Sequence, residues 1–372
     1  MKTGIKLLRG WSAKLIYISS LLPFFISRGR SAEQSLILDT SAVIQIFMLA
    51  VIIVFLIFDY RKLSKSIAWL YENKGAFRTI ITLYLLMTLS TIWSVNPALS
   101  AYRSVESFAF LFLVIRHRLD IKNLEEYAVF WSYWGLLIGL LVPLVFRYST
   151  INIANLHGFG VYYITSIFFF PKLAGLKYVQ LLFGIVLIIA TSAKSYIGFS
   201  LGWLHQRLRN NKNFALKIIL LFVVISVIYA AWNSVIDLFF YGKTDEQIQN
   251  GSGRKQVWLL LLDIYAKRPF FGYGFCAGEK FGLDGFGTNV LEAHNSLLSL
   301  ALSIGLLGPV LLLVLFFRLY KLSVKMEHNS EFWLIMLIMS FVFSLLDNSF
   351  GVRVSPAVLS NLALFIGLIS YK

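Results

Sequence analysis

The stretch SLLSLALSIGLLGPVLLLVLFF, residues 296–317, decides the fold class because it contains no charged side chain. A helix of this length crosses the hydrocarbon core of a bilayer, which takes about 20 apolar residues. We therefore predict a transmembrane helix here. An imidazole, His294, stands two residues before it. A titratable side chain at the mouth of a membrane helix needs a functional explanation.

The composition of the whole chain also indicates that a lipid bilayer surrounds it. The 372 residues are 58% hydrophobic and only 14% charged, which leaves too few charges to cover a water-facing surface. Long apolar runs recur along the chain, whereas the alternating strands of a membrane barrel do not. The sequence therefore predicts an all-α integral membrane protein. Its one cysteine, Cys276, excludes an intramolecular disulfide.

We expect a single polytopic membrane domain, residues 1–372, with about 12 transmembrane helices. The apolar segments are 11–27, 36–58, 76–95, 99–116, 127–146, 158–171, 177–191, 195–206, 216–240, 296–317, 331–347 and 353–371. An even number of spans places both termini on one side. Most of the 34 Lys and Arg residues fall on that side, so the positive-inside rule predicts that both termini are cytoplasmic. The first apolar segment is interpreted as an uncleaved span.

One connection on the opposite, periplasmic side is long and comprises residues 241–293, between spans 9 and 10. A loop this long in a compact bundle is usually functional. It contains SGRKQVWLLLLDIYAKRP, residues 252–269, which predicts an amphipathic helix lying flat on the membrane with its apolar face down. The apolar residues of that face are Val257, Leu260, Leu261 and Ile264. The Gly-rich residues that follow form either a lid over a site or a plain surface loop.

Several cations stand at predicted helix mouths on the periplasmic side. Charged groups at membrane depth are costly and usually mark a site. Together these cations suit a polyanion, because Arg binds phosphate with a two-point fork and Lys binds it as a point charge. Taken singly, each is also explained as a side chain that reaches the lipid headgroups. The residues are Arg103, Lys194, Arg254 and Arg353.

A lone histidine beside a span is more often structural than catalytic, and His294 has to be weighed against that background. No second histidine or cysteine cluster stands at metal-ligand spacing, so we expect no metal. No Walker or GxGxxG sequence occurs. The net charge of +16 follows the membrane topology, and we expect no nucleic-acid partner. The position of His294 at the end of the long loop favours a role as a base.

Two stretches, SGRKQVWLLLLDIYAKRPFFGYGF and EAHNSLLSLALSIGLLGPV, resemble the O-antigen ligase and polymerase family of bacterial membrane glycosyltransferases. SVNPALS and TSAKS are similar to the family as well, and the resemblance covers roughly two-thirds of the chain. It implies a GT-C-like helical architecture. The residues that carry it are Arg254, Trp258, Pro269, Gly272, Gly274, His294, Asn295, Gly305 and Gly308.

The resemblance implies inverting transfer of a glycan from an undecaprenyl-diphosphate-linked oligosaccharide at the periplasmic face of the inner membrane, without metal or other cofactor. His294 would orient or deprotonate the acceptor hydroxyl, with Arg254 as its catalytic partner. The family usually has arginine where this chain has Lys194, so two-point phosphate binding is lost there. The residues that would bind the diphosphate and substrate with Arg254 are Lys194, Arg353, Arg103 and Asn295.

Polymerase and ligase remain alternatives. A polymerase extends O-antigen or other surface polysaccharide repeat units on an acceptor lipid-linked glycan, whereas a ligase attaches the glycan to lipid A core. Many ligases have an acidic residue after His-Asn, and Ser296 at that position favours a polymerase. A flippase of lipid-linked oligosaccharides is the second alternative. A carrier places its polar groups near the bilayer midplane, which disfavours it, but the break at Gly305–Pro309 in the span 296–317 is a feature that a carrier would share. The expected partners are these glycolipids, the bilayer and a chain-length regulator.

Overall fold

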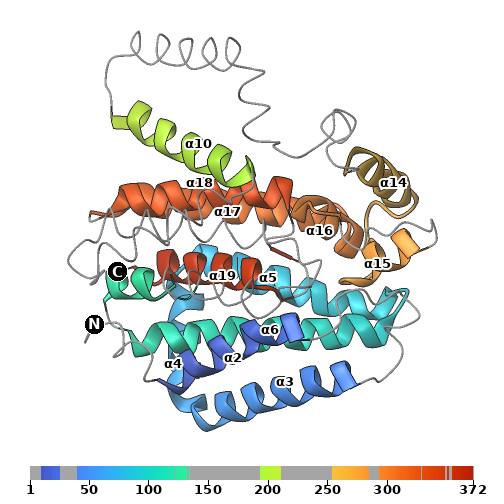
Figure 1. Ribbon diagram of the computed structural model, residues 1–372, viewed down its shortest axis with the longest axis horizontal. Helices are drawn as coiled ribbons and strands as arrows, with labels where there is room; N and C mark the ends of the chain where they lie inside the picture. The colour runs from blue at the N-terminus through green and yellow to red at the C-terminus, as the bar shows by residue number, and fades with distance from the viewer. Residues whose placement is uncertain are drawn as a thin grey trace.

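The computed structural model describes residues 10–25, 40–121, 123–131, 134, 193–210, 254–284, 293–327, 329–347, 350–351 and 354–371. Regular structure within these ranges is entirely helical, which confirms the all-α class. Most of the long helices run along the longest axis of the molecule, so the bundle has two ends (Figure 1). The helices are α2 (Trp11–Phe25), α3 (Thr40–Phe58), α4 (Tyr60–Asn73), α5 (Gly75–Leu89), η2 (Ser90–Trp93), α6 (Pro97–Asp120), α10 (Ala193–Asn210), α14 (Arg254–Lys267), α15 (Ala277–Asp284), α16 (Ser296–Ile304), α17 (Leu307–Lys325), α18 (Ser330–Leu346) and α19 (Pro356–Ile369).

Three stretches of the described chain are long and apolar enough to cross a membrane: Gly75–Trp93, Pro97–Asp120 and Leu307–Lys325. A fourth is reached if α3 and α4, which are bent by 84° at their junction, count as one span. These helices support a membrane-embedded chain. The number of 12 spans stays a prediction, because segments 158–171, 177–191 and 216–240 and most of 127–146 lie outside the described residues.

The predicted span 296–317 is not one helix. The structure divides it into α16 and α17, and α17 continues to Lys325. The division occurs at Gly305, whose φ of 71° lies in the left-handed region that favours glycine. A Cβ at this position would overlap the carbonyl oxygen of Phe270. Hydropathy carries no signal for such a change in backbone direction, whereas Gly305 and Pro309 do mark a break, so the expectation of one continuous helix was wrong.

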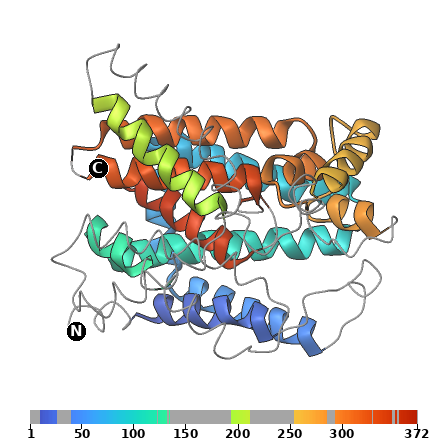
Figure 2. The ribbon, with the colours of Figure 1, turned by 45° about the horizontal axis from the view of Figure 1, so that its top comes forward.

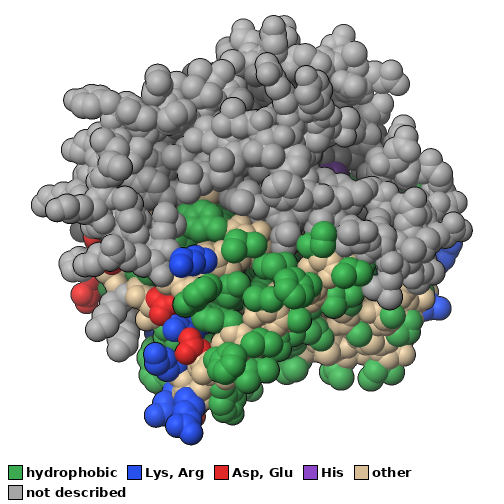
Figure 3. Space-filling model, turned by 60° about the horizontal axis from the view of Figure 1, so that its bottom comes forward, with side chains coloured by type: hydrophobic (Ala, Val, Ile, Leu, Met, Phe, Trp, Pro, Cys, Tyr) green, Lys and Arg blue, Asp and Glu red, His purple; other side chains and the backbone are tan. Residues whose placement is uncertain are grey.

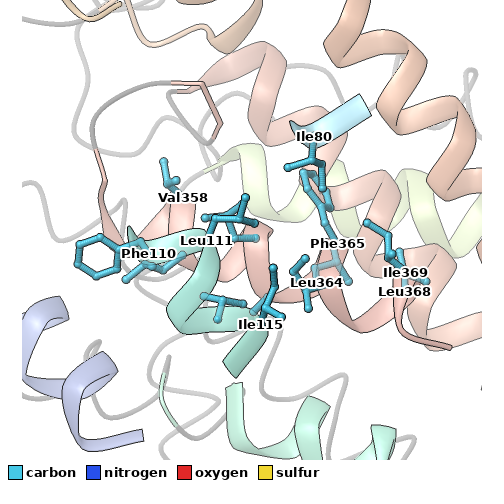
Figure 4. Packing of buried hydrophobic residues seen from close by; sticks show 14 of the residues in the cluster. Ile80, Phe110, Leu111, Ile115, Val358, Leu364, Phe365, Leu368 and Ile369 are labelled. Carbon is cyan, nitrogen blue, oxygen red and sulfur yellow. The ribbon is translucent and has the colours of Figure 1, made fainter. Parts of the chain in front are cut away.

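Helix α19 lies at the centre of the bundle, between α5, α6, α17 and α18. Its residues 362–366 are buried on every side, which is the pattern of a core helix rather than of an amphipathic surface helix. Figure 4 shows Phe365 of α19 beside Ile80 of α5, with Leu111 and Ile115 of α6 nearby. This core joins the N-terminal and C-terminal helices into one body.

Helices α10 and α18 pack closely because two glycines of α10 face α18. A Cβ at Gly198 would lie 3.1 Å from Met339 Cα, and one at Gly202 would lie 3.0 Å from Ile335 Cα. Small residues four positions apart commonly allow such close approach between membrane helices. The two contacts run in opposite sequence directions, so the helices are antiparallel. The start of α10 therefore lies beside the last turns of α18.

One end of the bundle, which we call the basic end, collects the start of α2, the α4–α5 corner and the ends of α6, α17 and α19. Ser12 Oγ donates to Asp120 Oδ2 at 2.7 Å, and Lys74 Nζ donates to the carbonyl oxygen of Tyr371 at 2.7 Å. The first and last described helices thus meet at the same end. Figure 3 shows a face on which hydrophobic side chains cover much of the described surface, while Lys and Arg side chains, with Asp and Glu side chains among them, gather toward one side.

Candidate active site

The opposite end, which we call the site end, holds α14, α15 and α16 together (Figures 1 and 2). A turn, residues 268–276, connects α14 to α15 and fills the break between α16 and α17. Its backbone pairs with the broken helix: Leu306 N donates to Pro269 O at 2.8 Å, and Tyr273 N donates to Leu302 O at 2.7 Å. The backbone groups freed by the break are therefore satisfied by the turn.

The same turn contacts the start of α6, where the stretch SVNPALS lies. Val95 N donates to Tyr273 O at 2.9 Å. The backbone of Phe275 makes two further hydrogen bonds: its N–H donates to Ser90 Oγ, and its carbonyl accepts from Ser100 Oγ. Gly274 has a φ of 100°, and a Cβ there would overlap Ser94 Oγ. Three stretches that are separate in the sequence thus form one scaffold.

The segment that carries His294 is fixed from both sides by its neighbour Ala293. Trp258 Nε1 donates to the Ala293 carbonyl at 2.6 Å, and the buried Glu279 carboxylate accepts from the Ala293 N–H. His294 itself has a φ of 49°, an uncommon conformation for a residue with a side chain. Asn295 is the N-cap of α16. These contacts set the position and direction of the imidazole.

Asn295 and Ser296 tie the start of α16 to the end of α18. Asn295 Oδ1 accepts from Leu298 N at 3.0 Å, and its Nδ2 donates to Leu345 O at 3.0 Å. Ser296 Oγ donates to the Asp347 carbonyl at 3.2 Å and accepts from Phe350 N at 3.1 Å. These bonds give the Asn295 amide a structural role, and its binding of substrate stays a prediction.

The structure places a carboxylate beside the imidazole. His294 Nδ1 and Asp347 Oδ1 are 3.1 Å apart, and the two side chains are 30% and 15% exposed. An ionised carboxylate only accepts hydrogen bonds, so Nδ1 carries the proton in this pair and Nε2 is the basic nitrogen of the ring. Sequence reasoning missed Asp347, although it lies in the same short stretch as Arg353, DNSFGVR.

The expected cations are placed to different degrees. Arg254 begins α14, one helical turn before Trp258. Lys194 lies in the first turn of α10, and the register with α18 puts its backbone near the end of α18 that leads to Asp347. Arg353 lies outside the described residues. The backbones of Arg254 and Lys194 are thus both brought to the site end.

Arg103 has a carboxylate partner within its own helix. Its Nη1 lies 2.8 Å from Glu106 Oε2 and 3.1 Å from Oε1, and both side chains are largely buried. The pair stands one turn after Ser100, which contacts the turn. Binding of a diphosphate by Arg103 stays a prediction. The Glu106 carboxylate would repel a phosphate bound there.

The apolar face of the amphipathic helix packs on protein. Val257, Leu261 and Ile264 of α14 are buried in a cluster with Leu298 and Leu302 of α16. The expectation that this face lies down on the membrane was therefore wrong. The packing of α14 on α16 places the Trp258 side chain against the backbone of the segment that carries His294. The Gly-rich stretch considered as a lid runs to Gly287: residues 277–284 of it form α15, and 285–287 lie outside the described part.

Within the part of the chain that the structure describes, no three His, Cys, Asp or Glu side chains group in a way that could hold a metal ion. Independence from metals stays a prediction that follows from the resemblance.

Comparison with known proteins confirms the resemblance to the O-antigen ligase and polymerase family. Residues 178–313 match the model of the family described as O-antigen ligase. This range includes Lys194, Arg254, Trp258 and His294, and it stops before Asp347. No protein of established function matches the chain in a direct sequence comparison.

Proposed function

We propose that the protein transfers a glycan from an undecaprenyl-diphosphate-linked donor to a sugar hydroxyl, because residues 178–313 match the model of the family described as O-antigen ligase. We assign it to the extension of O-antigen or other surface polysaccharide repeat units. The observation that carries this proposal is the His294–Asp347 pair, held on a fixed segment at the mouth of a membrane helix.

In the proposed reaction, His294 Nε2 takes the proton of the acceptor hydroxyl. The acceptor oxygen then bonds to the anomeric carbon of the donor from the face opposite the diphosphate, which inverts that carbon. The bond from the anomeric carbon to the phosphate oxygen breaks, and undecaprenyl diphosphate leaves with the electron pair. Arg254, Lys194 and Arg353 offset the charge of the leaving group. The donor bond stores the energy of the reaction, so no nucleotide is consumed.

Asp347 supports this role through electrostatics. A positioned base contributes on the order of 10²–10⁴ in rate, and cations at the developing anion add a further stabilisation of the transition state. The carboxylate at Nδ1 keeps the ring in the tautomer that accepts a proton at Nε2, and it stabilises the imidazolium that forms. The fixed Ala293 backbone removes the need to reorient the ring during the reaction.

The position after His-Asn supports a polymerase over a ligase. Ser296 has no exposed surface, and its hydroxyl is bonded to the backbone of both Asp347 and Phe350. The glycan profile of a deletion strain tests this choice. Single capped repeat units on lipid A core indicate a polymerase. Long chains left on the lipid carrier indicate a ligase and overturn the assignment.

The interlocked helix break argues against a flippase. Broken helices in carriers open onto a substrate site near the midplane. Here the turn 268–276 occupies the break and pairs with its backbone. Purified protein in detergent, given a lipid-linked donor and acceptor, separates the two classes. Unchanged glycan joining by His294→Ala refutes the base assignment. A protein that joins nothing, yet moves the glycolipid across vesicles, is a flippase.

The proposal places the protein in the inner membrane, with both termini in the cytoplasm and the site end at the periplasmic face. A chain-length regulator is the expected protein partner of a polymerase. Tags on the first and last residues, probed with a membrane-impermeant reagent, test the orientation. Labelling of both tags in intact spheroplasts contradicts it.

A further inference from the structure

Two arginines lie side by side at the basic end, far from the His294 site, and Lys74, whose amine donates to the Tyr371 carbonyl, stands on the same corner. Arg318 of α17 reaches the start of α5, where its Nη1 donates to the Gly75 carbonyl at 2.6 Å and to Thr79 Oγ1 at 2.7 Å. Arg78 lies beside it: a Cβ on Gly75 would be 3.5 Å from Arg318 Nη1 and 3.9 Å from Arg78 Nη2. Lys74 directly precedes α5, on the same corner.

These positive charges have no counter-charge in the described chain. The ion pairs found at this end join Arg116 to Asp59 and Asp120, and none involves Lys74, Arg78 or Arg318. The first turn of α5 contains no acidic residue. Like charges this close repel one another, and the positive end of the α5 dipole adds to them. The cluster is therefore a place where an anion is stabilised.

Aromatic side chains at the same level indicate that this anion belongs to the membrane. Lys74 Nζ lies 5.6 Å from the centre of the Trp69 ring, and Lys321 Nζ lies 4.4 Å from that of Phe317. Both rings are substantially exposed. Aromatic residues beside cations are typical of the headgroup layer of a bilayer.

Helix α4 has the geometry of a helix in that layer. It is bent by 84° from α3, so it runs across the direction of the apolar helix that precedes it. It buries Leu63 and Leu70 against the protein and exposes Arg61 and Lys65. Because the buried leucines pack on the protein, the placement of α4 in the headgroup layer rests on its direction across α3 and on the exposed cations.

We propose that Lys74, Arg78 and Arg318 form a binding site for the phosphate of an anionic phospholipid headgroup, such as phosphatidylglycerol, in the leaflet at the basic end. The lipid phosphate bridges the α4–α5 corner and α17 and offsets their mutual repulsion. The site lies at the opposite end from the proposed glycan transfer and does not depend on it.

Purified protein in nanodiscs tests the site. Lipid binding is measured by native mass spectrometry and by the rise in melting temperature when phosphatidylglycerol replaces part of the phosphatidylcholine. Arg78→Gln removes one cation that makes no hydrogen bond within the described chain, so the fold is kept. We expect its affinity for phosphatidylglycerol to fall about fivefold, the usual contribution of one basic residue near an anionic surface. Arg78→Gln/Arg318→Gln should lose most of the rise in melting temperature.

Arg61→Gln/Lys65→Gln is the matched control, because it removes two exposed charges from the neighbouring helix and leaves the cluster intact. We expect this variant to keep the wild-type response. An equal loss in the control means diffuse attraction to the surface and overturns the proposal. Inorganic phosphate in a phosphatidylcholine nanodisc is the last arm. Protection by phosphate equal to that by the lipid identifies a free-anion site and also overturns the lipid assignment.

Discussion

Replacing Asp347 by asparagine tests the base assignment most directly. The side chain keeps its size but loses the negative charge that lies 3.1 Å from His294 Nδ1. With about 4 Å between charge centres and an effective dielectric constant of about 20 to 80, the carboxylate stabilises the imidazolium by about 1 to 4 kcal/mol. Both side chains are partly exposed, so screening favours the lower half of that range. We expect Asp347→Asn to transfer glycan about 10- to 100-fold more slowly.

The assay follows glycan joining by purified protein at saturating lipid-linked donor. Glu331→Gln, which removes a carboxylate at the other end of α18, is the control and should keep the wild-type rate. A well-folded Asp347→Asn protein with the wild-type rate refutes the reasoning.

Three further changes have defined outcomes. Gly274→Ala puts a side chain at a φ of 100° and into Ser94, just before α6. It should destabilise the protein by at least about 2 kcal/mol in thermal unfolding. Gly10→Ala is the control, because the added Cβ meets only ordinary contacts and should not destabilise the protein. Trp258→Phe keeps the ring but removes the donor to the Ala293 carbonyl, so the turnover rate should fall about fivefold with little change in the melting temperature. Lys194→Gln should weaken donor binding and Lys194→Arg should restore or improve it, as measured by KM for the donor; equal KM in both variants would remove Lys194 from the diphosphate site.

The helical class and the positions of most described helices follow from hydropathy, because an uncharged run has few structural options in a bilayer. The division of 296–317 at Gly305 does not follow from it. Hydropathy measures the solvent of a segment, and the left-handed φ at Gly305 depends on the carbonyl of Phe270, which is distant in the sequence. The amphipathic pattern of α14 predicts an apolar face but not what that face packs against. A bilayer and the surface of α16 both favour apolar side chains at those positions.

His294 was identified from its place at a helix mouth and from the resemblance, whereas its partner was not. Asp347 joins it only because Asn295 and Ser296 hold the start of α16 against the end of α18. No spacing rule along the chain expresses that contact. The signal in the sequence was that Asp347, a carboxylate, stands at the mouth of a neighbouring predicted span.

The interlock between residues 268–276 and the helix break has a consequence for how the chain is assembled. The turn precedes α16 in the sequence, so the ribosome delivers it first, before the helix whose backbone it completes. The turn 268–276 has therefore been synthesised when the α16–α17 segment enters the membrane. The backbone groups left unpaired at the helix break can then bond to the turn instead of facing lipid.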